Sequence, residues 1–134
     1  MNILIVDDEH RFRQTLMKHL KRKGINANGA ASGEEALEEL KKNSYDVVLL
    51  DLKMSGMSGI DVLKRIREQG NRAEVVILSG HALVESAMAA TDFGAFDYLL
   101  KPCDVEIIYD KMISAYERKQ EKEKALANKV QSKR

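Results

Sequence analysis

The 134-residue chain has little of several residue types that characterise common classes of protein. Its single cysteine excludes an internal disulfide and an all-cysteine metal site, and is typical of a reducing compartment. No apolar run approaches the ~20 residues of a membrane span. The N-terminal MNILIVDDEH has no basic segment before its short apolar run, so we do not expect it to be a signal peptide. We therefore expect a cytoplasmic protein with no membrane partner.

An excess of charge of one sign is also missing. A net charge of +1, with 44% hydrophobic and 32% charged residues, is typical of one soluble globular domain. Only residues 117–134 are strongly biased, with seven Lys or Arg against three Glu. This segment has no aromatic residue and no groove-reading motif, so we do not expect direct binding of nucleic acid. We predict a basic helical tail or linker over residues 119–134, a solvated extension of the last helix being the simpler alternative.

What the chain does contain is a regular alternation of short apolar runs and amphipathic segments. The runs are too short for globular helices and predict buried strands, whereas an apolar residue every three or four positions predicts helices. The predicted strands are 3–6, 25–30, 47–50, 74–78 and 97–100. The predicted helices are 10 to about 24, 33–42, 59 to about 70, 83–91, and one from 105 onward. Strict alternation of five strands and five helices predicts a doubly wound α/β fold with a parallel sheet.

Functional side chains follow four of the five predicted strands: Asp7 and Asp8, Asp51, Ser79, and Lys101. Each alone is readily explained as a cap or a solvated side chain, but the carboxyl ends of parallel strands meet at one edge, where such sheets bind ligands. Three carboxylates there repel one another unless a cation lies among them, and Mg²⁺ prefers such oxygen ligands. With Lys101 and Ser79 to stabilise phosphoryl oxygens, the set predicts a phosphorylatable aspartate, for which Asp51 on the central strand is best placed.

These elements, together with the DLKMSGMSG loop and the FGAFDYLLKP run, resemble the receiver domain of bacterial two-component response regulators. The resemblance covers residues 2–118, so we predict a receiver domain over residues 1–118. It implies a flavodoxin-like fold with strand order 2-1-3-4-5. It also implies a phosphorylation-switched module of a phosphorelay, which catalyses only its own phosphoryl transfer and dephosphorylation. Two positions depart from the family pattern: Ser55 stands where proline is usual, and Cys103 where phenylalanine is common.

The resemblance implies roles for the acidic residues. Asp51 would accept a phosphoryl group from a sensor histidine kinase. Asp7, Asp8 and Asp51 would hold Mg²⁺, or Mn²⁺ in its place, and the Lys53 backbone carbonyl would be a further ligand. Lys53 and His81 are candidates for controlling the lifetime of the phosphoryl group, although an exposed loop histidine is the simpler interpretation of His81.

The resemblance also implies a switch. Ser79 and Lys101 would bind the phosphoryl group, and movement of Ser79 would let Tyr98 turn inward. The surface formed by residues 83–116 would then repack to regulate an output domain or partner protein, or to form a homodimer. The peptide bond between Lys101 and Pro102 is expected to be cis, as X-Pro bonds can be.

Three other functions fit parts of the pattern. A phosphatase of the haloacid dehalogenase type also uses an aspartyl phosphate, but it needs an acid two residues after the nucleophile, where this chain has Lys53. A flavin or nucleotide binder needs a glycine-rich phosphate cradle, which is missing beside these acids. A degenerate receiver, acting as a phosphorylation-independent interaction module, is the remaining alternative.

Overall fold

Five parallel strands form one sheet in the order β2-β1-β3-β4-β5, which confirms the predicted fold class and strand order. The strands are β1 (Asn2–Val6), β2 (Asn26–Ala30), β3 (Val47–Leu50), β4 (Glu74–Ser79) and β5 (Asp97–Leu100). The helices are α1 (His10–Arg22), α2 (Gly33–Lys42), α3 (Gly59–Glu68), α4 (Val84–Asp92) and α5 (Val105–Ser132). The computed structural model describes residues 1–80 and 84–132; His81 and the predicted helix start at residue 83 lie outside them.

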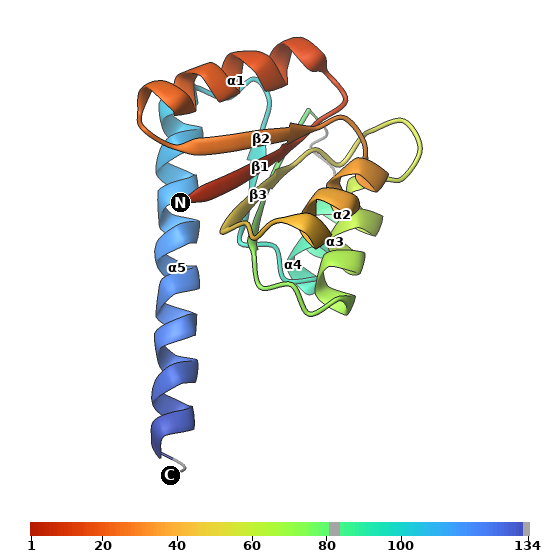
Figure 1. The fold of residues 1–134 in the computed structure, drawn as a ribbon. Helices are drawn as coiled ribbons and strands as arrows, with labels where there is room; N and C mark the ends of the chain where they lie inside the picture. The colour runs from red at the N-terminus through yellow and green to blue at the C-terminus, as the bar shows by residue number, and fades with distance from the viewer. Residues whose placement is uncertain (81–83, 133–134) are drawn as a thin grey trace.

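The sheet is covered by helices on both faces, because successive side chains of each strand point to opposite sides. In β1, Leu4 and Val6 belong to the core under α2, α3 and α4, whereas Ile3 and Ile5 belong to the core under α1 and α5. All four side chains are at most 1% exposed. Figure 1 shows α1 and α5 on one side of the sheet and the other three helices on the opposite side. This double burial explains why β1 and β3 are apolar without alternation.

The edge strand β2 had the weakest sequence support, since it reads NANGA. Among the described strands it pairs only with β1, in a register that places Asn26 opposite Asn2. The amide of Asn26 donates a hydrogen bond to the side-chain oxygen of Asn2 at 3.2 Å. An edge strand has one neighbour and stays partly solvated, so it tolerates polar residues that a central strand would not.

The last helix extends well beyond the sheet. α5 has 28 residues, so the expected boundary between residues 118 and 119 lies inside a continuous helix. The Nζ atom of Lys119 lies 3.2 Å from Asp46 Oδ1, and that of Lys122 lies 2.7 Å from Glu74 Oε1. These contacts join the start of the basic tail to the amino end of the sheet, and Figure 1 shows the rest of α5 projecting away from it. Over the described ranges, no helix combines the length and apolar character that crossing a bilayer requires.

Candidate functional site

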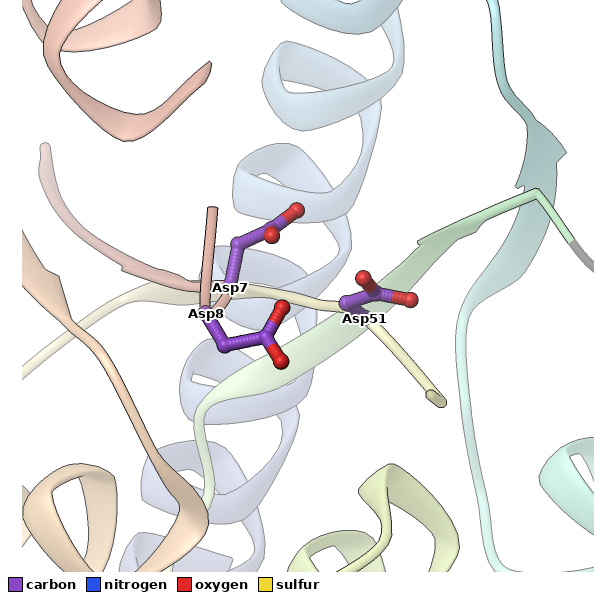
Figure 2. A group of neighbouring side chains, drawn as sticks. All are labelled: Asp7, Asp8 and Asp51. Atoms are coloured by element: carbon purple, nitrogen blue, oxygen red, sulfur yellow. The ribbon is translucent and has the colours of Figure 1, made fainter. Parts of the chain in front are cut away.

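Three carboxylates meet at the carboxyl edge of the sheet. Asp7 and Asp8 follow β1, and Asp51 follows β3; these strands are neighbours whose last residues, Val6 and Leu50, are paired in register. One oxygen from each of the three aspartates lies within 4.8 Å of the others. Figure 2 shows the three side chains side by side at the strand ends. Asp7 and Asp51 are only 2% and 8% exposed, whereas Asp8 is open to solvent.

Backbone N–H groups orient the carboxylates from the loop that follows β3. The N–H of Lys53 donates to Asp51 Oδ1 at 3.2 Å, and the N–H of Ser55 donates to Asp8 Oδ2 at 3.2 Å. The second contact ties the end of β1 to the β3–α3 loop, although these residues are far apart in sequence. Each hydrogen bond occupies one carboxylate oxygen, so the other oxygen of each group can bind a further partner.

Lys101 reaches the acidic cluster from the end of β5. Its Nζ atom lies 2.5 Å from Asp7 Oδ2 and 3.6 Å from Asp51 Oδ2, so the hydrogen bond is to Asp7. Burial disfavours the charged ammonium, but the hydrogen bond and charge of Asp7, with the charge of Asp51, outweigh it and raise the pKa of Lys101. Lys101 is therefore a cation at neutral pH. Its Nζ atom also lies 4.3 Å from the ring centre of Phe12 on α1.

The donor set fits a hard divalent cation. The three aspartates offer carboxylate oxygens close together, and the single ammonium of Lys101 offsets only one of their charges. Mg²⁺ is commonly held by a few carboxylates and completes its coordination with water and phosphate oxygens. The partly exposed side of this cluster, at Asp8, leaves room for such ligands.

Ser79 ends β4, and Tyr98 lies on the neighbouring strand β5, which leads to Lys101. Ser79 is the last residue of β4 and is fully buried, and its carbonyl accepts a hydrogen bond from the Lys101 N–H at 2.9 Å. Tyr98 is half-buried on β5 and packs against the core under α2, α3 and α4. Burial, together with the charge of Asp51, raises the pKa of its hydroxyl. The peptide bond between Lys101 and Pro102 is cis.

Besides Phe12, two further residues that the sequence had not marked as functional contact the site. Arg13 on α1 donates from Nη1 to the backbone carbonyl of Asp7 at 2.6 Å. Gly59, the first residue of α3, packs so closely on the site that an added Cβ would lie 2.3 Å from the Asp51 carbonyl oxygen. Gly59 had been predicted only as the approximate start of a helix, and its position beside Asp51 was not visible from sequence spacing.

Comparison with known proteins agrees with the fold. The model of the response regulator receiver domain family matches residues 3–113. The DNA-binding transcriptional regulator NtrC of Klebsiella pneumoniae is 35% identical over 127 residues, which are 92% of this chain and 27% of that protein. The regulatory protein AtoC of Escherichia coli is 39% identical over 104 residues, covering 78% of this chain and 23% of that protein. A response regulator receiver domain structure from Clostridium thermocellum has 35% identity and a TM-score of 0.83, covering 89% of this chain and 96% of its own.

The chain belongs to the response regulator receiver domain family, whose members are signalling domains of two-component systems. It spans about a quarter of the length of the curated relatives that it matches, 27% of NtrC and 23% of AtoC. The match to the receiver structure, by contrast, extends over nearly the whole of both chains.

Proposed function

We propose that this receiver domain is switched by phosphorylation of Asp51, in a Mg²⁺-dependent transfer from a sensor histidine kinase. The observation that carries the proposal is the grouping of Asp51 with Asp7 and Asp8 within 4.8 Å, with the Lys101 ammonium 3.6 Å from Asp51. Carboxylates can act as nucleophiles toward phosphorus, and a buried site with positive charge nearby favours the transferred phosphoryl group.

Asp7, Asp8 and Asp51 are the side chains that would hold Mg²⁺, with the Lys53 backbone carbonyl as the expected further ligand. Mn²⁺ takes the same hard oxygen ligands and is the expected substitute. When bound, the metal would neutralise charge that develops on the phosphoryl oxygens. The chain's own contribution is to hold the carboxylates together through the backbone hydrogen bonds from Lys53 and Ser55.

In the transfer, one Asp51 oxygen forms a bond to phosphorus as the bond from phosphorus to the histidine nitrogen breaks, and that nitrogen keeps the electron pair. The Lys101 ammonium turns from Asp7 toward the new phosphoryl oxygens, and the Ser79 hydroxyl donates to another of them. Hydrolysis of the acyl phosphate by water returns Asp51 to its free state. The domain thus catalyses only its own phosphorylation and dephosphorylation.

The signal would pass from the site to the surface formed by residues 83–116. Movement of Ser79 toward the phosphoryl group makes space into which Tyr98 turns, and the change repacks α4, β5 and the first part of α5. We propose that this surface regulates an output domain or partner protein, or forms a homodimer. Residues 1–118 are the receiver in this scheme, and residues 119–134 are a linker toward an output domain.

Intact mass spectrometry after incubation with acetyl phosphate tests the proposal. The wild-type chain should gain one phosphoryl group only when Mg²⁺ is present. Asp51→Asn should gain none, whereas Asp110→Asn, at an exposed position on α5, should behave like the wild type. A gain that persists in Asp51→Asn would refute the assignment. No gain from acetyl phosphate or from a histidine-phosphorylated partner would favour the degenerate receiver instead.

A further inference from the structure

The Lys101 ammonium has an aromatic neighbour as well as its carboxylate partners. The ring of Phe12, on α1, lies with its centre 4.3 Å from Lys101 Nζ. Phe12 is half-buried, and the Lys101 side chain is 21% exposed, so the contact is largely shielded from water. A cation over the face of an aromatic ring is attracted by the ring's quadrupole, more strongly as water is excluded.

We propose that Phe12 is a positioning residue that keeps the Lys101 ammonium at the acidic cluster while it changes partners; this inference rests on the proposed function. The ammonium is hydrogen-bonded to Asp7 and is 1.1 Å farther from Asp51, at 3.6 Å against 2.5 Å. In the proposed transfer it turns from Asp7 toward a phosphoryl group on Asp51.

The ring face suits this movement. A carboxylate fixes the ammonium by a directional hydrogen bond, whereas a ring face attracts a cation at any point over it within about 6 Å of the ring centre. A divalent cation among the carboxylates would weaken the hold of Asp7 on Lys101, since both positive charges compete for the same oxygen. The contact with Phe12 does not depend on that oxygen. It therefore holds the ammonium near Asp51 when the hydrogen bond to Asp7 is released.

A purely structural role for Phe12 makes different predictions. The ring also packs against the core under α1 and α5, so its loss would affect packing whether or not it attracts the ammonium. Lys64 and Phe93 provide a matched control, because Lys64 Nζ lies 4.8 Å from the Phe93 ring centre, on the α3 and α4 side of the sheet. Phe93→Leu removes a similar contact without touching the carboxylate cluster.

The first test is nuclear magnetic resonance of the Lys101 ε-methylene protons, which needs no phosphorylation. Ring current from Phe12 should shift these protons upfield in the wild type, and Phe12→Leu should abolish the shift while Phe93→Leu preserves it. The upfield position should persist when Mg²⁺ is added. Protons at their ordinary position in the wild type, or an upfield shift that Mg²⁺ abolishes, would overturn the proposal even if Asp51 is phosphorylated as proposed.

The second test is the rate of phosphorylation by acetyl phosphate at fixed Mg²⁺. Phe12→Leu should lower the rate about fivefold, whereas Phe12→Tyr, which keeps the ring face, should restore most of it. Phenylalanine analogues with one, two or three ring fluorines at position 12 should lower the rate stepwise, because fluorination weakens the ring quadrupole with little change in shape. Equal rates across the fluorinated series would overturn the positioning role. A wild-type chain that takes no phosphoryl group would refute the proposed function, and the resonance test would still decide whether Phe12 holds Lys101.

Discussion

Substitution of Gly59 by alanine is expected to raise stability if helix propensity decides, and to lower it if packing in the tertiary structure decides. Gly59 is the first residue of α3, capped by the Ser58 hydroxyl, which accepts a hydrogen bond from the Asp61 N–H at 3.2 Å. Glycine is less favourable than alanine in helices by up to ~1 kcal/mol, so the local argument predicts stabilisation. The structure predicts the opposite, because an added Cβ would lie 2.3 Å from the Asp51 carbonyl oxygen and 2.5 Å from Leu52 Cα.

The size of the expected loss of stability depends on which atoms must move to make room for the added methyl group. Ordinary contacts of a methyl group begin near ~3.5 Å, so α3 or the chain at Asp51 must shift by about 1 Å. Both obstructing atoms belong to backbone, and neither can rotate away as a side chain would. The shift also strains the hydrogen bond from the Gly59 N–H to the Leu52 carbonyl, now 2.9 Å. Overpacking of this kind costs ~1–3 kcal/mol, and we expect Gly59→Ala to lie at the upper end, about 2–3 kcal/mol after the helix gain.

Urea unfolding, followed by circular dichroism, measures the loss directly. The midpoint of thermal unfolding should fall by roughly 10 °C in parallel. Gly80→Ala is the matched control, since nothing in the described part of the chain lies within 4 Å of the Cβ it would add. Because the obstructed atom is the carbonyl oxygen of Asp51 itself, Gly59→Ala should also slow phosphorylation. The reasoning is wrong if Gly59→Ala is as stable as the wild type, or if Gly80→Ala loses as much.

Two further predictions concern pairs of interacting side chains outside the site. Lys122→Met should lower the free energy of unfolding by about 1–2 kcal/mol, because Glu74, only 3% exposed, loses a partner that is itself partly solvated. Lys124→Met, on the exposed face of the tail, should change stability little; equal losses in the two variants, compared by urea unfolding, would contradict the pairing. Burial and the hydrogen bond to Glu39 raise the pKa of Tyr45 to about 12, above the value near 10 of an unfolded chain. The folded state thus holds this proton more tightly, and the free energy of unfolding should fall between about pH 10 and 12. Tyr45→Phe should remove that part of the pH dependence. If the variant and the wild type lose stability equally over this range, Tyr45 is not its cause.

Much of the fold was predictable because it depends on the pattern of apolar residues along the sequence. Unbroken apolar runs such as residues 47–50 occur where a strand is buried on both faces, and the alternation with helices requires parallel pairing. The convergence of Asp7, Asp8 and Asp51 followed from the same rule, since the ends of parallel strands share an edge. Strand β2, predicted at residues 25–30, had the weakest support from local pattern, because an edge position removes the apolar run on which strand prediction depends.

The class of fold and the candidate site residues could therefore be predicted from local sequence patterns. The contacts between residues far apart in the chain, such as the Phe12 ring over Lys101 and the pairing of Lys122 with Glu74, became visible in the three-dimensional structure. It also showed that Gly59 packs closely on Asp51. The physical reason is that periodicity reports only which face of an element is buried. Which side chains meet across two elements depends on the angle and distance at which those elements pack, and neither quantity is written in a local pattern.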